Sequence, residues 1–133
     1  MDYRDYIKNG ILILPEGFNS DLDCSYNNLT NLILPKGFNS TLNCYGNNLT
    51  KLILPKGFNS FLSCRNNNLT ELILPEGFNS ELYCYNNKLT NLILPEGFNI
   101  NNLMCDRNIK IHNWNEWLAL ERERKINMIL NEL

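Results

Sequence analysis

Residues 52–70, which read LILPKGFNSFLSCRNNNLT, recur almost unchanged every twenty residues. Leu, Ile, Leu, Pro, a charged residue, Gly, Phe and Asn occupy the same places in five blocks, which begin at Ile11, Asn31, Lys51, Glu71 and Asn91. The first four blocks continue as Ser-x-Leu-x-Cys-x-x-Asn-x-Leu-Thr. A fixed period of this length is typical of stacked supersecondary units, none of which buries its apolar face alone. The sequence therefore predicts a solenoid.

The composition limits the function classes. The 133-residue chain fits a single domain and carries a formal charge of -2. Nucleic acid and anionic membranes both favour a basic protein surface, so we expect neither as a partner. The apolar runs are too short to span a bilayer, and the N-terminus, MDYRDYIKNG, lacks the apolar core of a signal peptide. We therefore expect a cytoplasmic protein.

The five cysteines are 20, 20, 20 and 21 residues apart. Such an odd, evenly spread set is a poor disulfide framework, which favours free thiols in a reducing compartment. The first four follow a Leu by two residues with polar neighbours, the alternation of a strand whose Leu and Cys face inward. We expect a buried column rather than a metal site, because sulfurs in a row do not converge on a tetrahedron. The column is Cys24, Cys44, Cys64, Cys84 and Cys105.

An Asn follows each Cys by three residues, at the point where the chain must leave the strand. An inward Asn amide has both donors and acceptors for the backbone of the turn and of the next repeat. We expect a structural ladder and no binding role for its members. They are Asn27, Asn47, Asn67, Asn87 and Asn108.

The return leg of each repeat reads Leu-Ile-Leu-Pro-x-Gly-Phe-Asn-Ser. Pro disfavours a helix and Gly permits a tight corner, so we expect extended chain. Alternation places Leu12 and Leu14 inside, and Ile13 outside or between coils. The aromatic residue of each leg is expected to stack inside as a spine. The spine is Phe18, Phe38, Phe58, Phe78 and Phe98.

The pattern Leu-x-Cys-x-x-Asn-x-Leu resembles the signature of leucine-rich repeats, with Cys in one Leu position. The short period and the Leu-Pro-x-Gly return resemble the repeats of bacterial secreted effectors and of arrays in giant viruses and phages. The resemblance covers roughly residues 11–110. It implies a right-handed leucine-rich repeat solenoid that binds proteins on a concave parallel sheet, with an extended convex side without regular helices and no catalysis in the repeats.

One position departs from that family, which places Leu three residues before the first strand Leu. This chain has Asn19 and its equivalents there, with Phe one residue earlier. We expect Phe to fill the space through a small bulge or a wider turn.

The two ends are expected to cap the coil, with an N-terminal cap at residues 1–10, five repeats at 11–110 and a helical cap at 111–133. Residues 2–8 suit one or two helical turns ending at Asn9 and Gly10, with Tyr3, Tyr6 and Ile7 covering the first coil.

The C-terminal segment predicts a helix from Trp114 to about Asn131 that covers the last coil. As an alternative, residues 126–133 also form a dimer interface. The apolar stripe consists of Trp114, Trp117, Leu118, Ile126, Ile129, Leu130 and Leu133.

Because the structural positions are nearly invariant among the repeats, we look for function where the repeats vary, on the exposed strand face. Arg65 is expected to lie between Tyr45 and Tyr85 in one column, close enough to stack. Exposed Tyr, Arg and Phe are typical of protein-binding hot spots, although cross-strand pairing that only stabilises the sheet is the alternative. The candidate partner-binding residues are Tyr45, Phe61, Arg65, Tyr83 and Tyr85.

We therefore expect a protein-interaction module, such as a viral or bacterial effector acting in the host cytoplasm. A self-assembling structural protein that dimerises through the C-terminal helix is the alternative, and a carbohydrate-binding module using Tyr45, Tyr83 and Tyr85 is a lesser one. We expect no enzyme and no cofactor, because the lone His112 has no repeating partner and buried thiols are inert.

Overall fold

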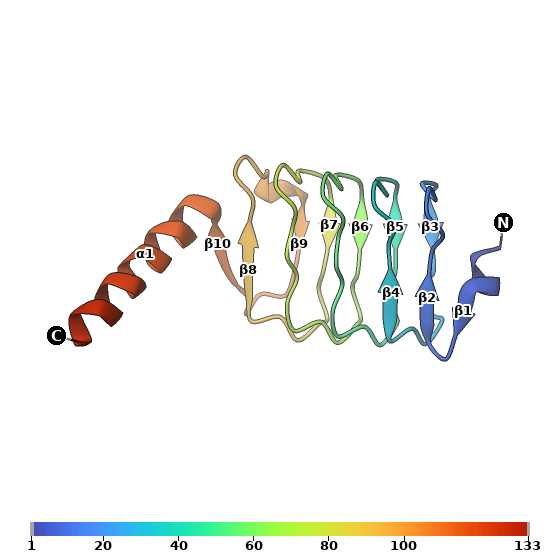
Figure 1. Ribbon diagram of the computed structural model, residues 1–133, viewed down its shortest axis with the longest axis horizontal. Helices are drawn as coiled ribbons and strands as arrows, with labels where there is room; N and C mark the ends of the chain where they lie inside the picture. The colour runs from blue at the N-terminus through green and yellow to red at the C-terminus, as the bar shows by residue number, and fades with distance from the viewer. Residues whose placement is uncertain (1, 133) are drawn as a thin grey trace.

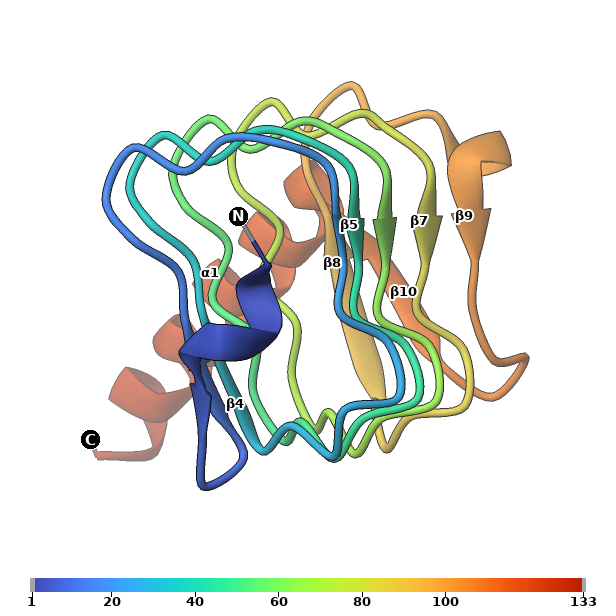
Figure 2. The same ribbon diagram turned by 90° about the vertical axis from the view of Figure 1, so that its right-hand side faces the viewer.

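The computed structural model describes residues 2–132, apart from the side chains of residues 114 and 116–118. The chain winds into a β-solenoid of about five coils with a 20-residue period (Figure 1). Viewed from the N-terminal end, it turns clockwise as it recedes, so the coil is right-handed (Figure 2). We number the coils one to five from the blocks that begin at Ile11, Asn31, Lys51, Glu71 and Asn91.

Each coil contributes one short strand to a five-stranded parallel sheet. The register places each inward Leu beside the equivalent Leu of the next coil, as in Leu42 beside Leu62. The last pair, Leu82 and Leu103, is 21 residues apart, and the 3-10 helix η2 (Ile100–Asn102) takes up the extra residue. The strands are β3 (Leu22–Asp23), β5 (Leu42–Asn43), β6 (Leu62–Ser63), β7 (Leu82–Tyr83) and β9 (Leu103–Met104).

The return legs lie on the opposite side of the coil and contain no helix among the described residues. At one end β2 (Ile11–Ile13) pairs in parallel with β4 (Asn31–Ile33). At the other end β8 (Asn91–Leu94) pairs in parallel with β10 (Lys110–Asn113). Residues 51–55 and 71–75 between them form no strand. A sixth return leg thus follows the five repeats and precedes the helix.

The core follows the expected alternation. Leu12 and Leu14 are buried, whereas Ile13 is exposed. Four of the five cysteines are buried beside the inward Leu residues, and Cys105 in the last coil is half-buried. All five cysteines are free thiols.

The Phe spine is confirmed. Neighbouring rings stack with centroids 6.0–6.1 Å apart and planes within 5–11°. Each Phe enters the core through a turn in which the Phe18 amide donates to the Pro15 carbonyl (3.1 Å) while Gly17 has a φ of 82°. Hydrogen-bonded strands are about 4.8 Å apart, so the coils are spaced more widely at the Phe spine than at the sheet.

The inward Asn ladder is confirmed for four of its five expected members. The Asn47 amide nitrogen donates to the carbonyls of Cys24 and Cys44, both at 3.0 Å. Its oxygen accepts from the backbone amides of Asn27 (3.0 Å) and Leu29 (2.9 Å). Each Asn therefore serves its own turn and the preceding coil, not the following one as predicted. Within the described residues the ladder ends at Asn87, because Asn108 is exposed and Ile109 is buried in its place.

A second Asn ladder, which the sequence analysis did not predict, runs along the other corner of the coil. The Asn39 backbone amide donates to the Asn19 side-chain oxygen at 2.7 Å, and the Ser40 hydroxyl donates to the same oxygen at 2.9 Å. The same amide contact recurs down the coils, at 2.7–2.8 Å, from Asn59, Asn79 and Asn99. Asn at this position bonds the backbone of the next coil and does not fill the core.

The N-terminal prediction was partly wrong. The 3-10 helix η1 (Tyr3–Tyr6) is followed by strand β1 (Ile7–Lys8), which pairs antiparallel with β2. Asn9 and Gly10 have φ angles of 53° and 77°, so they form a two-residue hairpin turn rather than a helix end. Tyr3 and Ile7 pack against the core as expected, whereas Tyr6 is exposed.

The C-terminal helix α1 (Trp114–Asn131) has the predicted bounds, but it leaves the last coil at an angle and points away from it (Figure 1). Leu120, Ile126, Ile129 and Leu130 are all at least half exposed, so this part of the helix does not cover the coil. The side chains of Trp114, Trp117 and Leu118, and all of Leu133, lie outside the described residues.

Replacing Asn67 by Ala tests the inward ladder. The change leaves the carbonyls of Cys44 and Cys64 and the amide of Leu49 without their buried partner. We expect a loss of about 3 kcal/mol or more in unfolding free energy, measured by chemical denaturation. The control is Asn48→Ala on the exposed side of the equivalent turn in the preceding coil, which should change stability by less than about 0.5 kcal/mol. Equal losses would contradict the ladder.

Thiol reactivity tests the inward direction of the Cys column. Burial raises the pKa of Cys24 and Cys84 to about 12, and that of Cys44 and Cys64 well above the ordinary value. A bulky maleimide should modify half-buried Cys105 first and the others only after unfolding, as peptide mass mapping would show. Because unfolded thiols ionise near pH 9 and these do not, stability should fall as the pH rises above about 9. Rapid native labelling of Cys64 would contradict this.

Candidate binding face on the five-stranded sheet

Large side chains gather on the outer face of the five-stranded sheet, over coils two to four. They come from positions on either side of the inward Leu and Cys, where strand alternation points side chains away from the core. We call this group the aromatic cluster, and all of its members are half-buried. It consists of Tyr45, Phe61, Arg65, Tyr83 and Tyr85, the five residues expected from the sequence.

Arg65 lies between two tyrosines of neighbouring coils, as predicted. Its guanidinium carbon is 4.3 Å from the centre of the Tyr45 ring and 5.7 Å from that of the Tyr85 ring. One guanidinium nitrogen also donates to the Tyr85 hydroxyl at 3.1 Å. Two cation–π contacts and a hydrogen bond hold the charged group in one orientation on the sheet.

The second half of the cluster covers a polar group. The rings of Phe61 and Tyr83 meet edge to face, with centroids 5.2 Å apart and planes at 76°. Ser63 pairs with Tyr83 in the sheet, lies two residues after Phe61, and is only 2% exposed on what would otherwise be the solvent side of the sheet. Its hydroxyl is buried without a hydrogen-bond partner. The rings thus exclude water from the middle of this face.

Tyr26 and Gly46 extend the cluster toward the first coil, and the sequence analysis did not select them. The Tyr26 ring meets Tyr45 edge to face at 5.1 Å. A Cβ at Gly46 would lie 2.5 Å from the Tyr26 ring, and Gly46 has a φ of 70°. Gly46 is the only Gly at this position, where the other coils have Tyr, Asn, Asn and Arg, and this exception is the signal that could have predicted the packing.

Acidic residues bound the cluster at both ends of the sheet. In coil one Asp21 accepts from the Thr41 amide at 3.0 Å, and Asp23 accepts from the Ser25 hydroxyl at 2.6 Å. In coil five Asp106 accepts from the Asn86 amide at 3.0 Å. The face therefore presents an aromatic centre with one cation, flanked by carboxylates.

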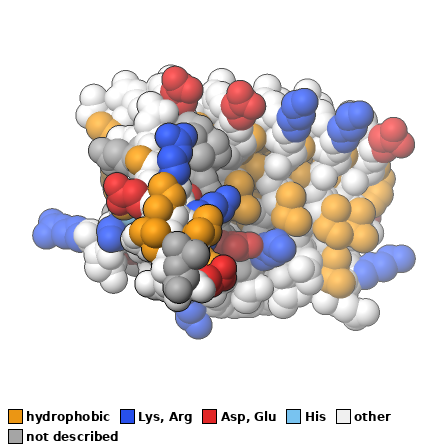
Figure 3. Space-filling view, turned by 60° about the vertical axis from the view of Figure 1, so that its left-hand side comes forward, with side chains coloured by type: hydrophobic (Ala, Val, Ile, Leu, Met, Phe, Trp, Pro, Cys, Tyr) orange, Lys and Arg blue, Asp and Glu red, His pale blue; other side chains and the backbone are white. Residues whose placement is uncertain are grey.

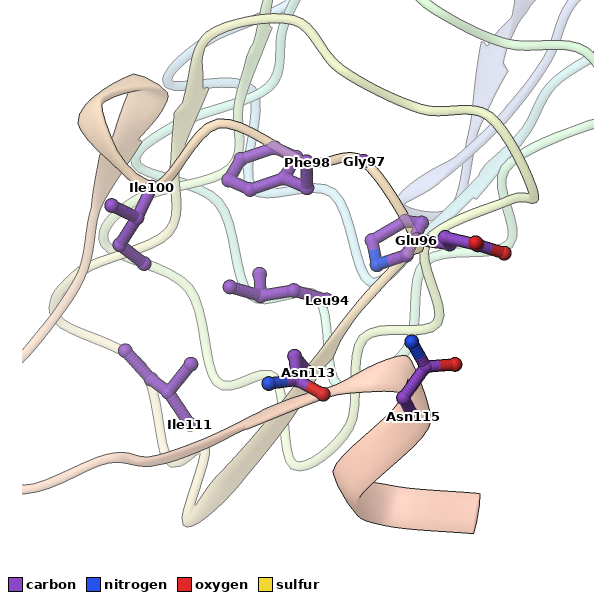
Figure 4. Close-up of a pocket in the computed structure, with 9 residues that line it drawn as sticks. Leu94, Glu96, Gly97, Phe98, Ile100, Ile111, Asn113 and Asn115 are labelled. Carbon is purple, nitrogen blue, oxygen red and sulfur yellow. The ribbon is translucent and has the colours of Figure 1, made fainter.

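The cluster continues into the open end of the coil. A cavity of about 420 Å³ is lined by Tyr85, Leu103, Met104 and Cys105 among others. Beside it a larger hollow of about 590 Å³ is lined by Leu94, Phe98, Ile100, Ile111 and Asn113 (Figure 4). Apolar side chains of the last coil line both hollows.

The residues that an enzyme or a metal centre would use are not grouped. Across residues 2–132 there is no set of three His, Cys, Asp or Glu side chains placed to hold a metal ion. The His112 ring nitrogen contacts the Asn91 side-chain oxygen at 3.3 Å across the β8–β10 pair. In the described part of the chain no helix is both long and apolar enough to cross a membrane.

One apolar row escaped the sequence analysis because it does not vary. The central Ile of each return leg points outward, so an invariant position forms a surface (Figure 3). Figure 3 shows orange side chains along this side of the coil, with charged side chains at its borders. The row is Ile13, Ile33, Ile53, Ile73 and Ile93.

The chain matches no family model, no curated protein sequence and no solved structure. Its own 20-residue period and the coil that this period builds are what place it among repeat proteins. Its function has to be argued from its surfaces.

Substitution of Ser63 by Ala tests whether the aromatic rings exclude water from the centre of the cluster. Because the hydroxyl has no partner and is buried, its removal should leave stability unchanged or raise it by about 1 kcal/mol in chemical denaturation. A loss of more than about 1 kcal/mol would show that the hydroxyl is bonded in solution, and that the aromatic rings do not seal the face.

Proposed function

We propose that this protein is an interaction module that binds another protein through the aromatic cluster on its five-stranded sheet. The observation that carries the proposal is the set of oriented aromatic and Arg side chains above the water-excluded Ser63. Tyr and Arg in a dry, packed centre surrounded by polar residues match the anatomy of binding hot spots.

Order in the cluster supports binding over simple sheet pairing. Arg65 is held by Tyr45 and Tyr85 before any partner arrives, so little side-chain entropy remains to be lost on association. The flanking carboxylates of Asp21, Asp23 and Asp106 favour a partner whose rim is basic. The partner is therefore a protein with an apolar or aromatic anchor and basic residues around it.

We also propose that these repeats are leucine-rich repeats, the family that the sequence pattern resembles. The five-stranded sheet is then the concave face of the solenoid, in keeping with the wider spacing of the coils at the Phe spine. The protein acts without a catalytic centre or cofactor, in the cytoplasm, as an effector does. Nucleic acid and membranes are not its partners, because the net charge of -2 provides no basic face.

Self-association through α1 is the second candidate, favoured by the exposed Ile126, Ile129 and Leu130 on that helix. Carbohydrate binding has less support. The Tyr45 face that would stack on a sugar ring is occupied by the Arg65 guanidinium at 4.3 Å.

The test is a selection of binders from a displayed library of natural protein fragments, followed by affinity measurement with purified variants. Tyr83→Ala and Arg65→Ala should each weaken the selected complex at least tenfold, because they remove hot-spot groups. The Lys88→Ala variant, changed at an exposed residue of the following turn, is the matched control and should bind like the natural protein.

Binders whose affinity is unaffected by Tyr83→Ala and Arg65→Ala would move the site away from this face. A selection that yields glycoproteins recognised only through their glycans would replace the protein partner by a carbohydrate.

A further inference from the structure

The outward row of isoleucines on the return legs is an apolar surface that no part of the chain covers within the described residues. Ile13, Ile33, Ile53 and Ile73 are 49–73% exposed, and Ile93 is half-buried. We call the side of the coil that carries them the isoleucine face. A continuous exposed apolar stripe is uncommon on a monomer and is typical of an interaction surface.

The middle of the isoleucine face is hollowed. A groove of about 150 Å³ lies between coils three and four, lined by Lys51, Ile53, Glu71 and Ile73 among others. It lies where residues 51–55 and 71–75 form no strand. Counting β10, the face has six return legs, and this groove lies between the third and the fourth. The groove therefore marks the centre of the face.

Charged residues border the isoleucine face in two rows. The first residue of each leg forms one row, which reads Ile11, Asn31, Lys51, Glu71, Asn91 and, in β10, Lys110. The residue between Pro and Gly forms the other row at the turn, which reads Glu16, Lys36, Lys56, Glu76 and Glu96. All of the charged residues in both rows are exposed.

A two-fold rotation can place each row against the same row of a second copy so that opposite charges face each other. A two-fold axis that runs along the strands through the central groove sets leg three against leg four of a second copy, and leg two against leg five. At the turn row, Lys56 then faces Glu76, and Lys36 faces Glu96. At the other row, Lys51 faces Glu71. Each pair occurs twice in the dimer, so all six charge pairs are attractive.

The neighbouring register is excluded by the same charges. An axis one coil earlier, between coils two and three, sets Lys36 against Lys56 and Glu16 against Glu76. These like-charge pairs are repulsive and also occur twice. The central register thus combines full overlap of the six legs with complementary borders.

We propose that the isoleucine face binds a second copy of this chain, giving a two-fold dimer centred on the groove between coils three and four. Ile53 of each copy then faces Ile73 of the other, and Ile33 faces Ile93. The five-stranded sheets point outward on both sides, so the dimer leaves the aromatic cluster accessible.

The size of the face sets the expected affinity. Six legs about 5 Å apart and about 15 Å wide give roughly 400 Å² of planar contact on each copy. Over both copies this is about 800 Å², below the roughly 1,000 Å² expected of a stable interface, so we expect a weak, reversible dimer with a dissociation constant of about 100 micromolar.

The first experiment is sedimentation equilibrium of the full chain from micromolar to submillimolar concentration. Ile53→Asp places two charges at the centre of the interface and should raise the dissociation constant at least a hundredfold. Its far-UV spectrum should not change, because Ile53 is 68% exposed. The control Ile129→Asp removes an equally exposed Ile from α1 and should leave the dimer intact.

Charge reversal tests the register. Lys56→Glu should weaken the dimer about tenfold, because it creates two like-charge pairs. Adding Glu76→Lys should restore the affinity. Adding Glu16→Lys instead gives the same net charge but should not restore it, since Glu16 does not face Lys56.

A monomer at submillimolar concentration would overturn the proposal. A dimer that resists Ile53→Asp but is lost with Ile129→Asp would place the interface on α1. Equal rescue by Glu16→Lys and Glu76→Lys would reduce the charge effect to net charge and overturn the register.

Discussion

The fold depends on hydrogen bonds between asparagine side chains and the backbone of adjacent coils. Each coil changes direction twice without a helix, which leaves corner carbonyls and amides that no strand partner can reach. At one corner the Asn67 side chain bonds the carbonyls of Cys44 and Cys64 and the amide of Leu49. At the other corner Asn39 and its equivalents accept backbone amides of the following coil. Buried backbone groups need such partners, which explains the constancy of the inward Asn among the repeats. The second ladder repeats one exposed contact in each coil.

The repeat made most of the architecture predictable, because a correct assignment of the residues in one coil applies to every other coil. The alternation around Leu62 and Cys64, the Phe spine and the inward ladder all followed from this. The ends did not follow, since they lie outside the period. The prediction of a helix end at Asn9 and Gly10 is wrong, because the same pair is a strong hairpin signal between residues that can pair as strands. At the other end, apolar spacing predicted that α1 forms but not where it lies, because direction depends on packing that the spacing does not encode.

Positions that differ among the repeats revealed one candidate surface and missed the other. Column positions placed Arg65 between Tyr45 and Tyr85, and the structure confirms that contact. The same reasoning overlooked the isoleucine face, because it looked for function only at positions that vary among the repeats. Alternation places Ile13 outside or between coils, and the structure shows that it is exposed. Packing around Gly46 and the dry hydroxyl of Ser63 require coordinates, since both arise from the orientations of neighbouring rings.

The antiparallel strand β1 has a consequence for aggregation. Near-identical coils are templates for one another, and an exposed edge of a parallel sheet invites another chain to add in register. At the N-terminal end β1 runs against that direction on one side of the coil, while Asp21 and Asp23 place negative charge on the free edge of β3. Both devices discourage stacking of a further coil there. Head-to-tail stacking joins the N-terminal end of one molecule to the C-terminal end of the next, so hindrance at the N-terminal end discourages every such joint.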